Sequence, residues 1–310
     1  MLKYLVILLS DDCTSICQYE NSKASARLIP IETLRKGIIF GMKENLAIQF
    51  VLPDYELPTP YYEAINEIDH ISIAQPNSFL KPDITVLNGW SLSNAALSPK
   101  GVYILRTTFE DFKHSYFSVP EILLKVQRLN IIFTDIESID LSSELSIYQT
   151  IIDYLISKVV ELFKNKQTPE LNLLTDRLYL TSMNNCEAGN EVITLAPDGK
   201  FYVCPAFYYA KENPIGNLEK GLSIPNGQLY KREFAPICRR CDAYQCKRCI
   251  WLNKRLTLEC NTPSHEQCVL SHIERNGSAR LSVSLDCARL NIAQVFDECN
   301  YLDPFDLFAK

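Results

Sequence analysis

Short apolar runs, rich in β-branched residues and bounded by Pro, Asn, Asp or Gly, recur through the first half of the chain. Runs of this length and composition predict buried strands, because a parallel strand that is covered on both faces is apolar along its whole length. We expect six such strands, at residues 2–9, 47–52, 71–74, 84–87, 102–106 and 130–134.

Helical patterns fill the segments between these runs. Residues 31–43 follow Pro30, and proline favours the first turn of a helix because its missing N–H would be unpaired there anyway. The longest pattern, 144–164, repeats apolar residues near every 3.6 positions, and Ser142 or Ser143 can cap it. Shorter helices are expected at 60–68, 92–97 and 119–128.

This alternation of strands and helices predicts six βα units and a parallel sheet with right-handed crossovers. The pattern alone does not choose between an open α/β layer and a partial (β/α)6 barrel. In both architectures ligands bind at the carboxyl ends of the strands. Those ends carry polar residues, although polar residues flank strands in proteins of every function: Asp12, Asp54, Asn88, Arg106 and Asp135.

Composition narrows the classes of function. The 310 residues suit two domains, and the net charge of −6 disfavours a nucleic-acid binder. Only ten residues are glycine and no two are adjacent, so the phosphate-binding loops of nucleotide enzymes are absent. No apolar run approaches the roughly 18 residues of a membrane helix. We recognise no secretion signal either, and therefore expect a cytoplasmic protein without a membrane partner.

The cysteines are distributed unevenly. The first 185 residues hold only Cys13 and Cys17, whereas ten of the twelve cysteines come later. In the cytosol, dense cysteines are metal ligands more often than disulfides. We assign no chemistry to Cys287 and Cys299 near the end of the chain. The asymmetry predicts a cysteine-poor scaffold, a metal-binding module and a tail, at residues 1–168, 169–275 and 276–310.

Eight cysteines of the second half are spaced like metal ligands. Pro-Asp-Gly at 197–199 predicts a hairpin turn that brings Cys186 and Cys204 toward one end. Two CxxC pairs follow, separated by only four residues, which is short for one zinc ion held by both pairs. Ligands shared between two iron–sulfur clusters fit better, with zinc as the alternative metal. The candidate ligands are Cys186, Cys204, Cys238, Cys241, Cys246, Cys249, Cys260 and Cys268.

Two further interpretations concern the same region. His265, Cys268 and His272 share one helix face, but we expect Cys268 to be the ligand and the histidines to lie around it or on the surface. A nucleophilic dyad of Cys268 and His272 fits less well, because a metal-bound thiolate is not also a nucleophile. A basic cluster could bind nucleic acid, but it also balances anionic thiolates in an acidic chain, so we expect no nucleic-acid partner. The cluster comprises Arg239, Arg240, Lys247, Arg248, Lys254 and Arg255.

The cysteine pattern resembles the SPASM domain, the auxiliary iron–sulfur module of radical S-adenosylmethionine (SAM) enzymes that modify peptides. The overall chain, including residues 263–276, is similar to the CXXX repeat peptide maturase family. The SPASM signature contains the run CX2CX5CX3C, and in this chain the last two gaps of that run are each one residue shorter. The matching residues are Cys186, Gly199, Cys204, Cys238, Cys241, Cys246, Cys249 and Cys268.

The resemblance implies a partial barrel of the radical SAM type, followed by a small module that holds one or two 4Fe–4S clusters. In that module it implies one cluster on Cys238, Cys241, Cys246 and Cys268. It implies a second cluster on Cys186, Cys204 and Cys249, whose fourth ligand is Cys260 or is absent. Ribosomal-peptide (RiPP) modification beside a true radical SAM enzyme is the implied role.

The chain departs from the radical SAM pattern at two independent places. These enzymes carry CxxxCxxC in the loop after the first strand, but here Cys13 and Cys17 are followed by Glu20. Two thiolates and a carboxylate are a poor ligand set for a soft cluster. The glycine-rich segment expected after the second strand is replaced by residues 51–56, which hold no glycine. We therefore expect Cys13 and Cys17 to be ordinary thiols and SAM not to be cleaved.

Three functions are compatible with these features. The first is a degenerate radical SAM-like scaffold that holds auxiliary clusters and binds a cysteine-rich precursor peptide, a true radical SAM partner, or both. The second is an enzyme whose open cluster site ligates a substrate thiolate. The third is an interaction module built on structural zinc. No catalytic residue is assigned in any of the three.

Overall fold

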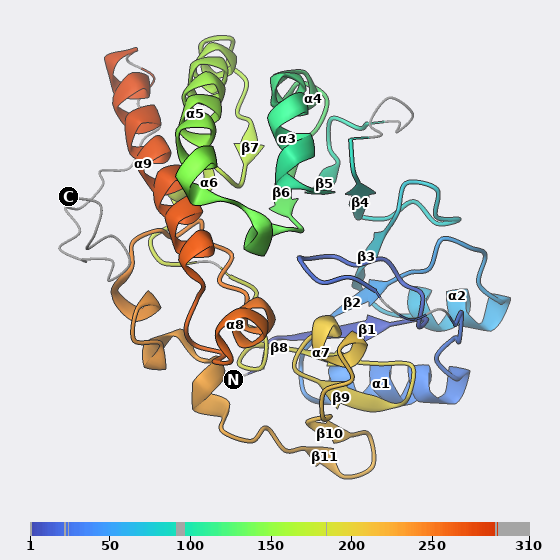
Figure 1. The fold of residues 1–310 in the computed structure, drawn as a ribbon. Helices are drawn as coiled ribbons and strands as arrows, with labels where there is room; N and C mark the ends of the chain where they lie inside the picture. The colour runs from blue at the N-terminus through green and yellow to red at the C-terminus, as the bar shows by residue number, and fades with distance from the viewer. Residues whose placement is uncertain are drawn as a thin grey trace. The chain divides into compact units, whose positions relative to one another are not determined.

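The computed structural model describes residues 2–21, 23, 25–90, 97–183, 185–288 and 290. It is an α/β protein with a large, mostly parallel sheet (Figure 1). The chain divides into two compact units: unit 1 comprises Met1–Leu87 and Cys186–Phe234, and unit 2 comprises Asn88–Asn185 and Ala235–Lys310. The domain limits predicted at 168 and 275 stay a prediction. The helix expected at 92–97 and Cys299 lie outside the described residues.

The central strand of unit 1 is β1 (Tyr4–Leu8). It pairs in parallel with β2 (Ala47–Val51) on one side and with β8 (Val192–Leu195) on the other. Beyond β2, the strands β3 (His70–Ala74) and β4 (Ile84–Asn88) continue the parallel arrangement. Beyond β8, pairing is antiparallel through β9 (Lys200–Tyr202), β10 (Gly216–Asn217) and β11 (Gly221–Leu222). Strands from both halves of the sequence therefore share one sheet in this unit.

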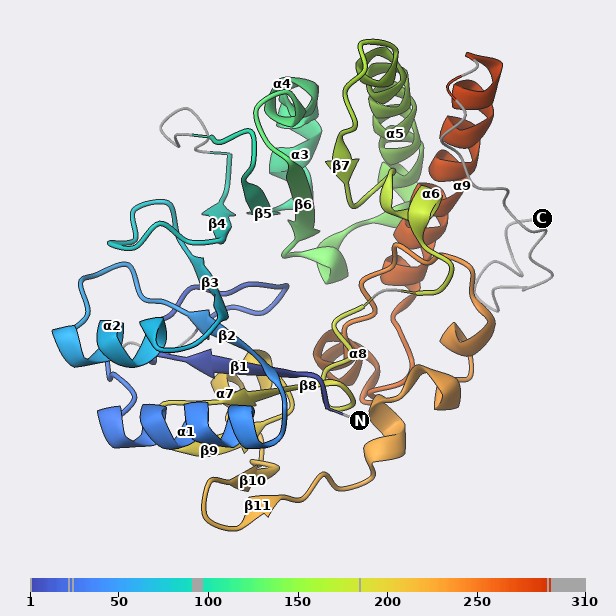
Figure 2. The ribbon, with the colours of Figure 1, turned by 180° about the vertical axis from the view of Figure 1, so that it is seen from behind.

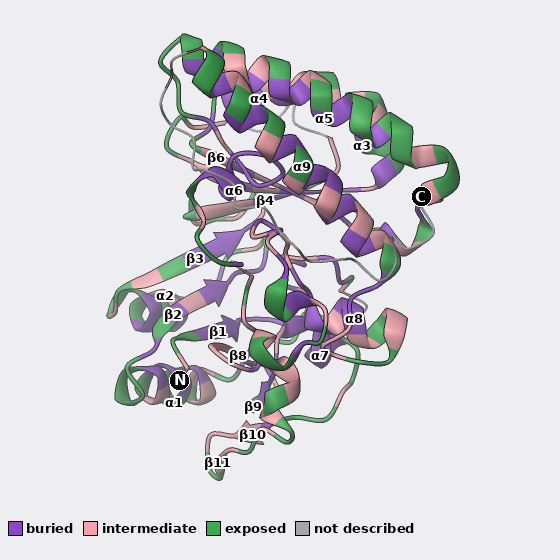
Figure 3. Ribbon diagram, turned by 90° about the vertical axis from the view of Figure 1, so that its left-hand side faces the viewer, coloured by how far each residue is buried: buried purple, intermediate pink, exposed green. Residues whose placement is uncertain are grey.

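Helix α1 (Ile31–Lys43) packs closely on the sheet of unit 1 because it has glycines on its inner face. A methyl group added at Gly41 would lie 2.8 Å from the Ile48 side chain of β2. The outer face of α1 is exposed (Figure 3). Two shorter helices complete the unit, α2 (Thr59–Asn66) and α7 (Pro205–Tyr209).

Unit 2 combines the parallel strands β5 (Val102–Thr107), β6 (Arg128–Phe133) and β7 (Glu170–Leu171) with two long helices. These helices, α5 (Leu141–Lys164) and α9 (His265–Cys287), lie side by side (Figures 1 and 2). The remaining helices are α3 (Phe109–Ser115), α4 (Val119–Leu123), α6 (Asp176–Tyr179) and α8 (Ile250–Thr257). Single 3-10 turns of this unit occur at η2 (Tyr116–Ser118), η3 (Ile136–Ser138) and η6 (Cys238–Arg240). Unit 1 contains two more, η4 (Gly227–Tyr230) and η5 (Arg232–Phe234).

All six predicted strands are confirmed to within two residues at each end, and the helix at 31–43 is confirmed. The hairpin at 197–199 is also confirmed: β8 and β9 are antiparallel, and Gly199 takes a φ of +78°. The glycine is required there because other residues adopt this backbone conformation only with strain. The helix expected at 60–68 is present but shifted to Thr59–Asn66.

Three expectations about helices are wrong. The connection between β3 and β4, residues 75–83, contains no helix, so six complete βα units are not formed. The helix expected at 119–128 ends at Leu123, and α3 precedes it, capped by Thr108, whose side chain accepts from the Asp111 amide at 3.0 Å. Asp140, rather than Ser142 or Ser143, caps α5, so this helix begins at Leu141. No described helix is long and apolar enough to cross a membrane.

Replacing Gly277 of α9 by valine should lower the free energy of unfolding by about 1–3 kcal/mol through overpacking. An added Cβ at Gly277 would lie 2.5 Å from Cγ2 of Ile152 on α5, and this β-branched side chain has little rotamer freedom in a helix. Urea unfolding followed by circular dichroism measures the change. Val283→Ala, on the same helix at a position that is 62% exposed, is the matched control. Equal stabilities of the two variants would contradict this packing.

Candidate functional site

The predicted cysteine ligands are divided between the two units. The first ligand set, Cys238, Cys241, Cys246 and Cys268, lies wholly within unit 2. Of the second set, Cys186 and Cys204 belong to unit 1. Cys249 and Cys260 belong to unit 2. The two candidate regions are therefore the thiols of unit 1, which include Cys13 and Cys17, and the thiols of unit 2.

Cys13 lies in the loop between β1 and α1 (the β1–α1 loop, residues 9–30) and is fully buried. Its thiol donates a hydrogen bond to the Val51 carbonyl at 3.0 Å and accepts one from the Ser10 amide at 3.3 Å. Burial raises the pKa of Cys13 to about 12, so the thiol stays protonated at neutral pH. Cys13 is thus a packed core thiol whose hydrogen-bond partners are main-chain atoms.

A buried carboxylate ties the β1–α1 loop to α7. Asp11 is 3% exposed and accepts a short hydrogen bond from the Tyr208 hydroxyl. Arg27 lies 3.2 Å from the same carboxyl group and also donates to the Tyr208 hydroxyl at 3.1 Å. Lys23 sits 3.1 Å from the centre of the Tyr208 ring and 3.8 Å from Asp11. Burial, followed by the bond to Asp11, raises the pKa of Tyr208.

Aromatic stacking strengthens the same attachment. Tyr19 of the β1–α1 loop stacks on Tyr209 of α7 with ring centroids 5.5 Å apart. Burial raises the pKa of Tyr209, which is 3% exposed. Glu20, which takes the third position of the CxxxCxxC pattern, is exposed at the next residue. The loop is therefore closed by its own side chains, with the first candidate ligand inside and the third on the surface.

The polar residues at the strand ends stabilise loops. Asp12 accepts hydrogen bonds from Ser10 and, at 3.3 Å, from Tyr55. In unit 2 the Arg106 guanidinium donates to the Asn88 side chain at 2.7 Å. Asp135 accepts from the Phe109 amide at 2.9 Å, and burial raises its pKa. Asp54 is exposed. None of these contacts requires a ligand.

Cys17 lies near the second ligand set, which the sequence pattern did not indicate. Cys204 is the N-cap residue of α7. Burial raises the pKa of Cys204, and the charges of Cys186 and Cys17 raise it further. Cys186 is exposed and Cys17 is half-buried. Spacing could not reveal the proximity of Cys17 and Cys204, because it depends on how the β1–α1 loop folds back over unit 1.

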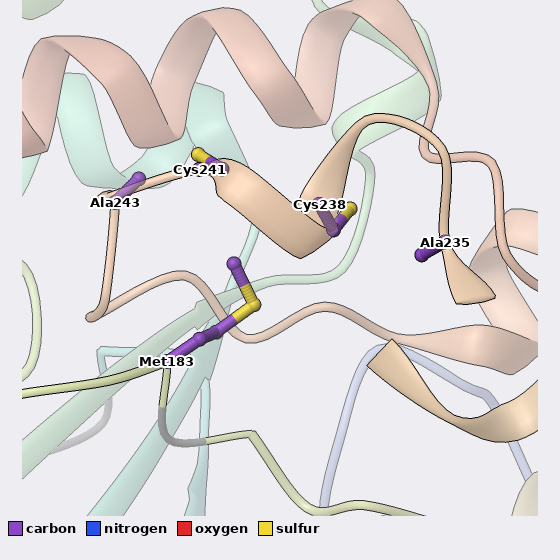
Figure 4. Packing of buried hydrophobic residues seen from close by; sticks show 5 residues of the cluster. All are labelled: Met183, Ala235, Cys238, Cys241 and Ala243. Atoms are coloured by element: carbon purple, nitrogen blue, oxygen red, sulfur yellow. The ribbon is translucent and has the colours of Figure 1, made fainter. Parts of the chain in front are cut away.

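In unit 2, the first CxxC pair is buried in an apolar cluster. Cys238 and Cys241 flank the turn η6 and pack with Met183, Ala235 and Ala243. Figure 4 shows the thioether end of Met183 reaching toward the turn between the two cysteines. Cys246 packs against this cluster, together with Tyr244. The pair is therefore in an environment with little access to water.

Helix α9 faces the loop that carries the two CxxC pairs (the thiol loop, residues 238–249). The His272 Nε2 lies 3.6 Å from the Cys241 Sγ. Ser271 forms a side-chain hydrogen bond with Cys246, which lowers the pKa of that thiol, although burial raises it overall to about 12. Cys268, one helical turn before His272, is 9% exposed. His265 is exposed at the start of the helix.

An ion-pair cluster fixes the thiol loop to two helices. Arg275 of α9 donates to the Asp242 carboxylate at 2.6 and 3.0 Å. Arg177 of α6 donates its Nε–H to the Asp242 carbonyl at 2.8 Å and lies 4.2 Å from the centre of the Tyr244 ring. Gln245 donates to the Ser271 carbonyl at 2.7 Å. The thiol loop is thus anchored at residues beside its cysteines.

Several basic residues of this region have acidic partners within unit 2. Lys247 lies 3.7 Å from Asp176, and Arg255 pairs with Glu137. Arg248, between two candidate ligands, is almost completely buried. Arg239 and Arg240 are exposed, so part of the cluster's charge lies on the surface and part is buried or paired.

A buried glutamate is in contact with the thiol loop. Glu274 of α9 accepts a hydrogen bond from the Tyr148 hydroxyl of α5 at 2.7 Å. Burial raises the pKa of Glu274 to about 7, and bonds from Tyr148 and Gln245 partly oppose the shift. Near neutral pH this carboxyl group is partly protonated.

Within the described residues, no group of three or more His, Cys, Asp or Glu side chains is arranged to hold a metal ion. The chemistry of the first ligand set still fits a soft metal, because Cys238, Cys241, Cys246 and Cys268 are four sulfur donors of one unit in a water-poor environment. To bind one metal, the four sulfurs would have to converge on it. The predicted ligand assignments stay predictions.

The chain matches no protein-family model and no curated protein. Among solved structures it is similar to native anSMEcpe with bound AdoMet and Cp18Cys peptide, at 13% identity and a TM-score of 0.58, over 92% of this chain and 99% of that one. Native anSMEcpe with bound AdoMet and Kp18Cys peptide is 14% identical with a TM-score of 0.58, over 92% of this chain and 99% of that one. Streptococcus suis SuiB bound to precursor peptide SuiA is 13% identical with a TM-score of 0.46, over 86% of this chain and 76% of that one.

At these identities the likeness to anSMEcpe concerns the fold. The chain has an α/β fold with a large, mostly parallel sheet, and this fold matches that of anSMEcpe. This part of the predicted fold class is confirmed, and the partial barrel and the SPASM-like module stay predictions.

Proposed function

We propose that the protein takes part in the maturation of ribosomal peptides as a degenerate radical SAM-like scaffold. Its cysteines hold auxiliary 4Fe–4S clusters, and it binds a cysteine-rich precursor peptide, a true radical SAM partner, or both. It does not cleave SAM. The membership in the CXXX repeat peptide maturase family that the cysteine pattern suggests is part of this proposal.

The observation that carries the proposal is the closed β1–α1 loop. A SAM-binding cluster needs three thiolates from this loop, and Cys13, the first of them, is fully buried with its thiol donating to the Val51 carbonyl. Freeing that sulfur would also disturb the neighbouring Asp11, whose carboxylate is buried among Arg27, Lys23 and Tyr208. A buried charge that loses its partners costs several kcal/mol, on the order of 3–5. The loop therefore favours its closed form over cluster binding.

The auxiliary sites are proposed from the thiols that remain. In unit 2, Cys238, Cys241, Cys246 and Cys268 would hold one cluster, which supplies a redox-active or Lewis-acidic centre when bound. Cys186 and Cys204 are the candidates of unit 1 for the other. In unit 2, Asp242 and Gln245 anchor the thiol loop beside its cysteines.

The proposed peptide partner is supported by the fold. The match covers 99% of anSMEcpe, whose structure holds AdoMet and Cp18Cys peptide, and this likeness of fold supports a peptide partner. Exposed and half-buried sulfurs of unit 1, at Cys186 and Cys17, suit a partner that itself carries thiols.

Structural zinc is the second candidate for the thiols of unit 2, and one observation favours it. His272 lies 3.6 Å from Cys241 and would complete a mixed sulfur–nitrogen set, which zinc accepts. An interaction module of this kind would need no iron.

Restoring the full CxxxCxxC pattern should not restore a SAM-binding cluster. In Glu20→Cys, Cys13 stays buried and bonded to Val51, so the iron content after anaerobic reconstitution should equal that of wild type. The measurement is iron and sulfide per chain, together with formation of 5′-deoxyadenosine from SAM under reducing conditions. Glu20→Ser is the matched control. About four additional irons in Glu20→Cys, or nucleoside formation by either protein, would contradict the closed loop.

A synthetic peptide with repeated CXXX units should bind the reconstituted protein at least about tenfold more tightly than its serine analogue, a difference of about 1.4 kcal/mol. Thiols of the peptide supply the discrimination, so the preference should disappear when both peptides are alkylated. Fluorescence anisotropy of the labelled peptides measures the affinities. Equal affinities for the cysteine and serine peptides would count against a cysteine-rich substrate.

A further inference from the structure

Helix α9 places several polar groups opposite the thiol loop at regular spacing. Counted from Cys268, the residues at i+3, i+4 and i+7 are Ser271, His272 and Arg275. Residues at these intervals share one face of an α-helix. On this face Ser271 contacts Cys246, His272 contacts Cys241, and Arg275 binds Asp242. Three consecutive contacts therefore join one helix face to one loop.

Ser271 and His272 contact two different sulfurs of the first ligand set. That set already offers four sulfurs, which is the number that a tetrahedral ion or a cubane cluster takes from protein. Ser271 and His272 are then additional groups, and both can donate a hydrogen bond to sulfur once it is a thiolate. Such hydrogen bonds fix the orientation of a ligand toward its metal.

We propose that α9 provides half of the metal site in unit 2: Cys268 as a ligand, and Ser271 and His272 as positioning residues that donate to the thiolates of Cys246 and Cys241. The proposal rests on the metal-binding part of the proposed function and adds residues that the cysteine pattern does not contain. Arg275 and Asp242 set the register of the helix against the loop, so the donors meet the correct sulfurs. Loss of an outer hydrogen bond of this kind typically weakens metal binding by about 10- to 100-fold.

The test uses Co²⁺ as the probe, because its absorption reports how many sulfurs it has and whether nitrogen is bound. The full-length chain is titrated anaerobically, and the bands that Cys246→Ser removes identify the site in unit 2. Ser271→Ala and His272→Phe should each weaken Co²⁺ binding there by about 10- to 100-fold, without a change in the position of the visible bands. His265→Gln, at the exposed start of the same helix, is the control and should bind as wild type does.

A second substitution at His272 tests whether the residue acts by donating a hydrogen bond or only by filling space. His272→Gln keeps an N–H donor and should recover most of the affinity that His272→Phe loses. Affinities equal to wild type in both Ser271→Ala and His272→Phe would overturn the proposal, as would failure of glutamine to rescue. A shift of the visible bands in His272→Phe would overturn it too, because it would make His272 a ligand.

The same experiment distinguishes this proposal from the proposed function. A folded wild-type chain that shows no sulfur-to-cobalt absorption would overturn the role of α9. A chain that binds Co²⁺ as described but takes up no iron and sulfide would refute the cluster and leave the role of α9 in place. Circular dichroism of every variant confirms that the fold is retained before affinities are compared.

Discussion

The buried carboxylate of Asp11 is the constraint on which the candidate site of unit 1 depends. A charge with 3% exposure persists only when partners surround it, and here the partners come from two segments. Arg27 and Lys23 belong to the β1–α1 loop, and Tyr208 belongs to α7. The hydrogen bonds and ion pairs of this one carboxylate therefore fix the β1–α1 loop against α7.

The position of the loop then decides what its cysteines do. Cys13 comes two residues after Asp11, donates to the Val51 carbonyl at the end of β2 and accepts from the Ser10 amide. Cys17 lies further along, close enough to Cys204 for its charge to raise the pKa of that thiol. In a radical SAM enzyme three thiolates of this loop converge on one cluster. Here the same loop divides its two cysteines between the core and the neighbourhood of the second ligand set.

The cysteines of the thiol loop in unit 2 are also held in place by contacts with other segments. The loop has little regular structure, so the positions of its cysteines depend on anchors outside the loop. Asp242 and Gln245 supply these anchors by binding Arg275, Arg177 and the main chain of α9. The packing of α9 on α5, with Gly277 against Ile152, holds the helix that receives them. Sulfur chemistry in this unit therefore depends on helix packing.

The sequence predicted the elements that rest on local signals. The β-branched runs located the six strands, Pro30 marked the start of α1, and Pro-Asp-Gly marked the β8–β9 hairpin. Helix α3 was missed because it is short and polar, and it is stabilised by the Thr108 cap and by burial of Phe109 and Phe112. Asp140 was missed as a cap for α5 because several adjacent residues can cap a helix and only the backbone conformation selects one.

For the candidate site, the spacing of the cysteines predicted which of them belong together, but it did not predict which other residues surround each sulfur. The i, i+3, i+7 pattern placed His265, Cys268 and His272 on one helix face, and the structure brings His272 to 3.6 Å from Cys241, whereas His265 lies at the exposed helix start. The bond of Cys13 to Val51 and the proximity of Cys17 to Cys204 join residues that are distant in sequence. Such contacts follow from the assembled sheet, and no local pattern encodes them.

The most direct test of the account is elemental analysis of anaerobically purified and reconstituted protein, comparing wild type with Cys246→Ser, Cys204→Ser and Cys13→Ala. The account predicts roughly eight irons and eight sulfides in wild type, a loss of about four irons in each of the first two variants, and no loss in Cys13→Ala. Zinc without iron in wild type, or a loss of about four irons in Cys13→Ala, would contradict it.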